Sequence, residues 1–569
     1  MESGIIVENL SYTYPGQSEP SLKNVNFTVT KGDFVLVAGP TGCGKSTLVY
    51  CLDGLIPHVF EGELKGRVIV NDKDTRDFEV YQLAQSVGTV FQNTENQLCS
   101  LIVEDEIAFG PENLALPKDE IRKRMDFAVE ATDIQDYLQK YVFNLSAGQK
   151  QRVVIASSLS LLPKILVLDE PLSELDPVGC REMLQTLKKL NKDLGMTIVI
   201  AEHKLEEVLS VVKTVFLMDE GRIVAKGEPA EVFKDVQLIE RLGLRVPETV
   251  KFSYKLIKEG LSTKFALSVE DVNAITSSIG AFPSKHILNS NAVGCQYENY
   301  EVHQPLVNVE GLCYSYNDGT IALRDINLSI YSGDFAVVLG CNGAGKSTLA
   351  QVMTGLLEPT RGKIFIDGRD SAKYGVAELA GIVGYTFQNP EHQLFCETVR
   401  DEVAFGPRQL GLLENEVKER VKDAMHVMGL EPLKDRDPQA LSRGQRLRVA
   451  IASVLSMSPK VLILDEPVAA QDLNQIVSLM THLKLLNKQG LAVVIITHDI
   501  NVVARYAGRV VLMAKGKIMA NGEPHEVLSN EELLFRSGLS PPTAVRLSKQ
   551  IGLPPMITVT EISHAIWGT

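Results

Sequence analysis

The chain contains two copies of one sequence pattern, and this duplication constrains its fold more than any other feature. Gln92 and Ser146 are separated by the same number of residues as Gln388 and Ser442. A repeat of this length indicates two copies of one domain in tandem. The corresponding segments are VENLSYTY at 7–14 and VEGLCYSY at 309–316, GPTGCGKST at 39–47 and GCNGAGKST at 340–348, and LSAGQ at 145–149 and LSRGQ at 441–445.

The domain boundaries follow from the repeat and from local composition. The segment 281–304 is rich in serine, asparagine and glycine and has little apolar periodicity, which predicts a linker. The sequences that begin near Pro247 and Pro541 resemble each other and predict a small C-terminal appendage on each copy. We therefore expect a first domain at 1–240, its appendage at 241–280, a linker at 281–304, a second domain at 305–536 and its appendage at 537–569.

A glycine-rich loop with the pattern G-x4-G-K-S follows an apolar run in each copy. Glycines allow a tight turn whose backbone N–H groups face phosphate oxygens, and the next helix N-terminus adds partial positive charge. We expect Lys45 and Lys346 to reach the β- and γ-phosphates of ATP. Ser46 and Ser347 are expected to bind Mg²⁺ through their hydroxyls. The loops comprise Gly39, Pro40, Thr41, Gly42, Cys43, Gly44, Lys45, Ser46 and Thr47, and Gly340, Cys341, Asn342, Gly343, Ala344, Gly345, Lys346, Ser347 and Thr348.

A second apolar run ends in an Asp-Glu pair in each copy, ILVLDE at 165–170 and VLILDE at 461–466. Asp169 and Asp465 are expected to hold Mg²⁺ through water. Glu170 and Glu466 are expected to polarise the attacking water, either as a general base or as a positioning group. An Asp-Glu-Pro sequence can also simply end a strand, but the two phosphate loops favour the catalytic interpretation.

The bulk composition excludes several classes of protein. The chain of 569 residues is 45% hydrophobic and 22% charged, which is ordinary for globular proteins. No signal peptide and no run of about 18 apolar residues is evident, and short β-branched runs such as 493–496 predict buried parallel strands. The eight cysteines form no C-x-x-C pair, which gives zinc no support and favours a reduced compartment. The formal net charge of −14 disfavours nucleic acid as a partner.

Both halves resemble the ATP-binding-cassette family. LSAGQ and LSRGQ match the family signature, and each lies at the same distance before its Asp-Glu pair. Gln92 and Gln388 match the Q-loop of the family. His203 and His498 match its switch histidine, which contacts the γ-phosphate. The resemblance implies an α/β fold with two tandem cassettes, each having a core parallel sheet with helices, an antiparallel β subdomain and a helical subdomain that carries the signature.

Two tyrosines in each half are candidates for the adenine contact. Tyr14 and Tyr316 match the aromatic residue that stacks on adenine in the family. Tyr12 and Tyr314 lie two residues earlier and compete for this role. Either tyrosine of a pair could instead be a core residue.

The resemblance also implies that each ATP site is shared between the halves. The signature of one half would close over the γ-phosphate held by the phosphate loop of the other, so the halves pair intramolecularly. The catalytic groups would be Glu170 with His203, and Glu466 with His498. The remaining ligands implied are Ser146, Gly148, Gln149, Ser442, Gly444 and Gln445 for ATP, and Ser46, Gln92, Asp169, Ser347, Gln388 and Asp465 for Mg²⁺.

The halves differ after the Asp-Glu pair. The first half has LSELD at 172–176, close to the usual D-loop, whereas the second has VAAQD at 468–472. Asp472 is retained but its neighbours are not. The sequence therefore leaves open whether the two sites turn over equally.

The segments between Q-loop and signature indicate the type of cassette. FQNTENQL at 91–98 precedes VEDEIAFGP at 103–111, and FQNPEHQL at 387–394 precedes VRDEVAFGP at 399–407. This pattern resembles the ATPases of energy-coupling-factor transporters, which import vitamins and cobalt or nickel. The resemblance implies a transmembrane coupling subunit, a substrate-binding membrane subunit and a peripheral position at the cytoplasmic face of the membrane. Fusion of both ATPases in one chain departs from the usual separate chains.

Acidic residues follow the Q-loop in both halves, and two interpretations of them remain open. Glu104, Asp105, Asp401 and Glu402 could stabilise a helix N-terminus by complementing its dipole. The resemblance implies instead that they accept arginines of the coupling subunit. The alternative to transport is a soluble twin-cassette ATPase acting on ribosomes or nucleic acid, which usually carries a long charged helical linker. A twin-cassette sugar importer is also possible, but one degraded site would be expected there.

Overall fold

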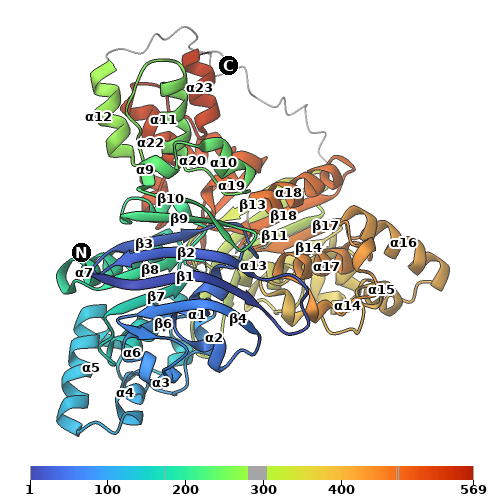
Figure 1. Ribbon diagram of the computed structural model, residues 1–569. Helices are drawn as coiled ribbons and strands as arrows, with labels where there is room; N and C mark the ends of the chain where they lie inside the picture. The colour runs from blue at the N-terminus through green and yellow to red at the C-terminus, as the bar shows by residue number, and fades with distance from the viewer. Residues whose placement is uncertain (1, 174, 280–303, 470, 472, 568–569) are drawn as a thin grey trace. The chain divides into compact units, whose positions relative to one another are not determined.

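The computed structural model describes residues 2–173, 175–279, 304–469, 471 and 473–567. The chain divides into two compact units, Met1–Gly280 and Ala281–Thr569, and each contains one copy of the repeat (Figure 1). The predicted linker 281–304 lies outside the described residues except for Gln304. Glu174, Ala470 and Asp472, which belong to the D-loop segments, also lie outside them. The finer division into domains and appendages stays a prediction.

The first unit is built on a six-stranded sheet in the order β10-β9-β3-β8-β7-β6. All neighbours are parallel except β10, which is antiparallel to β9. The central strands β3, β7 and β8 are buried along their whole length, as short β-branched runs predict. The strands are β3 (Phe34–Ala38), β6 (Val87–Val90), β7 (Ile165–Asp169), β8 (Thr197–Ala201), β9 (Thr214–Asp219) and β10 (Arg222–Gly227).

A four-stranded antiparallel sheet in the order β2-β1-β4-β5 accompanies the core sheet. Buried and exposed residues alternate along most of β2, so one face of this sheet packs on the core. Its strands are β1 (Ser3–Thr13), β2 (Leu22–Thr30), β4 (Glu63–Val70) and β5 (Lys73–Asp74).

Three sets of helices in the first unit are distinguished by their position relative to the core sheet. Helix α1 follows β3 and packs on β7. Beside β6, the helices α4, α5 and α6 pack against one another. Helices α10, α11 and α12 follow the core beyond β10 (Figure 1). The helices are α1 (Lys45–Leu52), α2 (Leu55–His58), α3 (Val80–Leu83), α4 (Val103–Asn113), α5 (Lys118–Thr132), α6 (Ala147–Leu159), α7 (Pro177–Leu194), α8 (Leu205–Val208), α9 (Pro229–Val232), α10 (Val236–Arg241), α11 (Glu248–Lys258) and α12 (Val269–Ile279).

The second unit repeats this architecture. Its core sheet has the order β16-β17-β18-β13-β19-β20 and its antiparallel sheet the order β12-β11-β14-β15. The strands are β11 (Val307–Ser315), β12 (Ile321–Ile330), β13 (Phe335–Leu339), β14 (Arg361–Ile366), β15 (Arg369–Asp370), β16 (Val383–Thr386), β17 (Val461–Asp465), β18 (Ala492–Thr497), β19 (Arg509–Ala514) and β20 (Lys517–Gly522).

The helices of the second unit match those of the first, with one difference. The chain passes from α13 to β14 without the short helix that follows α1 in the first unit. The helices are α13 (Lys346–Met353), α14 (Val376–Ala380), α15 (Val399–Gln409), α16 (Glu414–Val427), α17 (Arg443–Leu455), α18 (Leu473–Lys488), α19 (Ile500–Tyr506), α20 (Pro524–Ser529), α21 (Glu531–Arg536), α22 (Thr543–Gln550) and α23 (Val559–Trp567).

Each core sheet separates two hydrophobic clusters. In the first unit Leu36 belongs to the cluster that includes residues of α4 to α7, whereas Val35 and Val37 belong to the cluster that includes α1 and the antiparallel sheet. Alternate residues of a strand point to opposite faces, so one strand supplies both clusters. The predicted α/β fold of two tandem cassettes is confirmed. Among the helices in the described parts of the chain, none is both long and apolar enough to cross a membrane.

Candidate functional site

The two glycine-rich loops connect the central strand of each core sheet to a helix. Gly44 and Gly345 precede α1 and α13 with φ angles of 103° and 95°. A Cβ atom at Gly44 would lie 2.7 Å from the carbonyl oxygen of Ser21, so a side chain has no room there. The loop therefore presents backbone N–H groups and a helix N-terminus, which together suit a phosphate group.

The lysine of each loop is buried against the loop itself. Lys45 Nζ donates hydrogen bonds to the carbonyl oxygens of Gly39 at 2.8 Å and Pro40 at 3.0 Å. Lys346 Nζ makes the same pair of bonds, to the first two residues of its own loop. Each ammonium also lies near the glutamate of the Asp-Glu pair, at 3.8 Å from Glu170 Oε1 in the first unit and 3.9 Å from the matching oxygen in the second.

Asp169 and Asp465 end the strands β7 and β17 and are buried, and the Oδ1 atom of each has no hydrogen-bond partner within the described residues. The hydroxyls of Ser46 and Ser347 lie within hydrogen-bonding reach of these carboxyls. Burial raises the pKa of Asp169 to about 6 and also raises that of Asp465. A buried carboxylate oxygen without a donor, next to a serine hydroxyl, supplies the hard oxygen ligands that suit Mg²⁺.

The glutamates that follow have an unusual backbone conformation. Glu170 and Glu466 have φ angles of 46° and 47°, in the left-handed region that non-glycine residues rarely adopt. The N–H of Glu170 donates to Ala201 at 2.8 Å, and that of Glu466 donates to Ile496 at 2.9 Å, so the neighbouring strand holds each strained residue. Strain of this kind is concentrated at functional sites.

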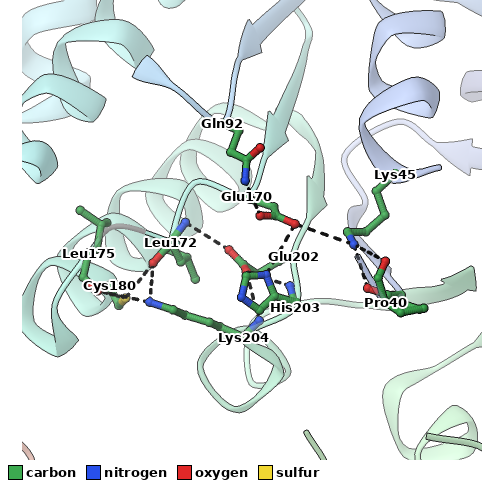
Figure 2. A network of polar contacts seen from close by, with 11 residues as sticks. Pro40, Lys45, Gln92, Glu170, Leu172, Leu175, Cys180, Glu202, His203 and Lys204 are labelled. Atoms are coloured by element: carbon green, nitrogen blue, oxygen red, sulfur yellow. Dashed lines mark hydrogen bonds and ion pairs between the residues drawn. The ribbon is translucent and has the colours of Figure 1, made fainter. Parts of the chain in front are cut away.

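In the first unit, Gln92 and His203 meet at Glu170 (Figure 2). Gln92 Nε2 donates to Glu170 Oε2 at 2.8 Å, and His203 Nδ1 lies 3.6 Å from Glu170 Oε1 and 3.3 Å from Glu202 Oε1. Burial by itself lowers the pKa of His203, but the hydrogen bond to Glu170 and the charges of both glutamates outweigh it and raise the pKa above 6.5. The structure thus brings Lys45, Gln92, Glu170 and His203 together.

In the second unit, the glutamate keeps the lysine and histidine neighbours but has a different partner at Oε2. His498 Nδ1 lies 2.9 Å from Glu466 Oε1, and Thr497 Oγ1 donates to Glu466 Oε2 at 3.1 Å. Gln388 is exposed. The hydroxyl of Tyr385 donates a hydrogen bond of 3.0 Å to Asp465 Oδ2, and the first unit has Thr89 at the matching position.

Sequence reasoning missed Glu202, Tyr385 and a further buried acid, Asp53, at the end of α1. Asp53 Oδ1 accepts the N–H of Leu55 at 2.9 Å, and burial raises the pKa of Asp53 to about 7. An alignment of the two halves marks all three positions, because the residue type differs between the halves at each of them. The matching pairs, first half then second, are Glu202 and Thr497, Thr89 and Tyr385, and Asp53 and Thr354.

The aromatic candidates separate by burial. Tyr12 is fully buried and its hydroxyl donates to Glu61 O at 2.8 Å, as expected of a core residue. Tyr14 lies 3.3 Å, between hydroxyl oxygens, from Thr47 at the start of α1, and the corresponding distance from Tyr316 to Thr348 is 2.9 Å. Tyr14 and Tyr316 are therefore next to the phosphate loops, in keeping with an adenine contact, although their role stays a prediction.

The signature residues form the N-termini of α6 and α17. Ser146 and Gln149 cap each other: Ser146 Oγ accepts the N–H of Gln149 at 3.4 Å and Gln149 Oε1 accepts the N–H of Ser146 at 3.0 Å. Ser442 and Gln445 make the same capping box. Both serines are exposed, with Gly148 and Gly444 in the first turn of each helix. That each signature faces the phosphate loop of the other unit stays a prediction.

The predicted docking acids need one correction. Glu402 is 2% exposed, and its Oε2 accepts the N–H groups of Phe395 and Cys396, both at 2.8 Å. Its true counterpart in the first half is Glu106, which is also buried and holds the matching loop. A carboxylate used in this way is not available to an arginine of a partner, so Glu402 is a structural residue. Glu104, Asp105 and Asp401 are exposed on the first turns of α4 and α15.

Comparisons with known proteins found a matching family model and similar proteins. A family model described as ABC transporter matches residues 22–173 and 323–469, one stretch in each unit. A protein of Methanosarcina mazei, named as a candidate ABC transporter ATP-binding protein, is 39% identical over 98% of this chain and 96% of its own length. A protein of Methanosarcina acetivorans with the same name is 40% identical over 98% of this chain and 92% of its own length. CbiO1 from Clostridium perfringens, described as part of the ABC transporter complex CbiONQ, has a solved structure that is 40% identical, with a TM-score of 0.38, over 41% of this chain and 94% of that chain.

The chain belongs to the ABC transporter family. It is an ABC-type ATPase that carries two cassettes in tandem.

Proposed function

We propose that this chain hydrolyses ATP at two Mg²⁺-dependent sites and thereby drives an importer of the energy-coupling-factor type. The observation that carries the ATPase is the convergence of four groups in each unit. In the first unit these are Lys45 from the phosphate loop, Asp169 and Glu170 from the end of β7, and His203 from the end of β8. The second unit has the same set, with Lys346, Asp465, Glu466 and His498.

The residues present fit a magnesium ion bound with the nucleotide. Ser46 and Asp169 would hold it in the first unit, and Ser347 and Asp465 in the second, since each aspartate keeps one buried oxygen without a donor. Gln92 and Gln388 would approach as the Q-loops adjust. The ion would neutralise charge that develops on the phosphate oxygens during transfer.

The chain's own groups would supply the remaining chemistry. Lys45 would exchange its carbonyl partners for phosphate oxygens. Glu170, held by Gln92, would orient the attacking water and accept its proton. His203 would donate a hydrogen bond to a phosphate oxygen, and its raised pKa favours the protonated ring that can do so.

The two halves would complete each other's sites. Ser146 and Ser442 are exposed at helix N-termini, where backbone N–H groups and the helix dipole favour an anion. We infer that Ser442 closes the site of Lys45, and Ser146 the site of Lys346. ATP would then draw the halves together, and hydrolysis would release them.

The proposed membrane partner is a transmembrane coupling subunit that works with a substrate-binding membrane subunit. Support comes from the resemblance of the segments after both Q-loops to energy-coupling-factor ATPases, and from relatives named as ABC transporter ATP-binding proteins. Glu104, Asp105 and Asp401 offer exposed carboxylates that could receive arginines in charge-assisted hydrogen bonds. Vitamins or transition-metal ions would be the cargo, and the cytoplasmic face of the membrane the working position.

The membrane role can be tested by charge reversal on the two exposed aspartates. The double substitution Asp105→Lys and Asp401→Lys is expected to abolish co-purification with membranes and substrate uptake, while basal hydrolysis is retained. Glu112→Lys, at the exposed far end of α4, is the matched control and should leave uptake unchanged. Unchanged membrane association and uptake in the double variant would contradict the docking role.

A further inference from the structure

Two charged residues on either side of His203 connect the catalytic turns of the first unit. Glu202 is fully buried, and its Oε1 accepts the N–H groups of His203 at 2.8 Å and Lys204 at 3.0 Å. Its Oε2 accepts the N–H of Leu172 at 3.1 Å. Leu172 lies two residues after Glu170, so one carboxylate bridges the turn that follows β7 and the turn that follows β8.

Lys204 makes a second connection between the same turns (Figure 2). Its Nζ donates to the carbonyl oxygen of Leu172 at 2.7 Å and to that of Leu175 at 3.3 Å. The thiol of Cys180 also approaches these two carbonyl oxygens, at 3.8 and 3.6 Å. The turn after Glu170 is thus held at an N–H group and at two carbonyl groups by residues adjacent to His203.

The second unit has different chemistry at the same positions. Thr497 replaces Glu202, and its hydroxyl donates to Glu466 itself and accepts the N–H of Asp499 at 3.1 Å. Asp499 replaces Lys204 and caps α19 by accepting the N–H groups of Asn501 and Val502. The side chain of an ionised aspartate has no N–H to donate, so it cannot hold carbonyl groups as the side chain of Lys204 does.

We propose that Glu202 and Lys204 are positioning residues of the first ATP site, which hold the turn after Glu170 and the turn carrying His203 as one rigid piece. The second site instead fixes Glu466 directly through the Thr497 hydroxyl. The proposal rests on the proposed roles of Glu170 and His203. It predicts that the geometry between these two groups depends on Glu202 and Lys204, which touch neither phosphate nor the attacking water.

Hydrogen exchange of the full-length chain tests the physical connection. The variants are Glu202→Ala with Lys204→Met, which removes both connections without supplying a hydroxyl like that of Thr497, and Lys204→Arg as the conservative control. Loss of charge-assisted hydrogen bonds is expected to raise amide exchange by about tenfold or more in 171–176 and 203–206 together. The matching segments 467–473 and 498–501 serve as internal controls. Lys204→Arg should keep the parent's rates, because a guanidinium also donates to carbonyl oxygens.

Steady-state ATP hydrolysis by the same variants tests the catalytic consequence. In a Glu466→Gln background, in which turnover by the second site is suppressed, the double variant is expected to lose about tenfold in kcat, while KM stays within about twofold, because ATP contacts are unchanged and only the catalytic pair is displaced. Unchanged exchange, faster exchange throughout the first unit, or an unchanged kcat in the presence of faster local exchange would each overturn the positioning role. A parent chain that hydrolyses no ATP would instead refute the proposed function, and the two failures are therefore distinguishable.

Discussion

Asp53 gives a stability prediction that depends on one buried carboxyl. It lies at the C-terminal end of α1, is 7% exposed, and has one oxygen, Oδ2, without a hydrogen-bond partner in the described part of the chain. Burial raises its pKa from 3.8 to about 7, because ionisation inside the protein is unfavourable. Asp53→Asn keeps an acceptor for the N–H of Leu55 and removes the ionisation.

The expected magnitude and sign follow from this pKa. The folded state binds the proton more tightly than the unfolded state, so the contribution of Asp53 to stability is full below pH 4 and is lost as the pH rises to about 7. At about 1.36 kcal/mol per pKa unit, the loss approaches about 4 kcal/mol at pH 8 and is about 2 kcal/mol at pH 5.5, both as upper limits. Relative to the parent, Asp53→Asn should therefore become increasingly stabilising between these pH values.

Denaturant unfolding of the first unit, followed at pH 5.5 and pH 8, measures this difference. Asp77→Asn is the control, because Asp77 is exposed in the same unit and its carboxylate stays in water. The expected result is a gain for Asp53→Asn that is larger at pH 8 than at pH 5.5, with no such change for Asp77→Asn. A gain that is independent of pH, or that falls as the pH rises, would refute the reasoning.

Three further predictions concern the ATP sites. Glu170→Gln and Glu466→Gln should each slow hydrolysis by about a hundredfold or more at its own site while ATP binding is retained. Single-turnover rates are expected to differ between the two variants, because Gln92 bonds Oε2 of Glu170 whereas Thr497 bonds Oε2 of Glu466. Equal rates would show that these partners have no kinetic effect. Ser442→Arg should impair hydrolysis at the site of Lys45, which nucleotide trapping in each half can measure, and a defect confined to the second half would contradict a shared site. Tyr385→Phe removes the hydrogen bond to Asp465, so Mn²⁺ should bind severalfold more weakly at one class of site in the presence of ATP. Electron paramagnetic resonance can follow this binding. An unchanged titration would show that the hydroxyl does not support the metal ligand.

The parts of the fold that depend on local pattern could be predicted from the sequence. The apolar runs before each glycine-rich loop and each Asp-Glu pair are buried central strands, because a strand covered on both faces must be apolar throughout. Glycines at Gly44 and Gly345 adopt positive φ angles that a phosphate loop requires. The arrangement of two cassettes followed from the repeat.

The contacts that join distant segments could not be predicted. Glu202 and Leu172 are bonded across the ends of β7 and β8, and only the parallel pairing of these strands brings them together. Glu402 resembled an exposed acid of a helix N-terminus, yet the loop at 395–396 folds back and buries it. Charge and position in sequence do not distinguish a docking carboxylate from one that satisfies buried N–H groups. An alignment of the two halves would have marked Glu202 and Tyr385 as differences, but not their roles.

The most direct test of the ATPase is hydrolysis by the full-length chain with both glutamates replaced. The proposed sites predict Mg²⁺-dependent release of phosphate by the parent chain, and its loss in the double variant Glu170→Gln and Glu466→Gln, with ATP binding preserved because Lys45 and Lys346 remain. Hydrolysis at the parent's rate in a double variant that still binds ATP would contradict the assignment of the catalytic site.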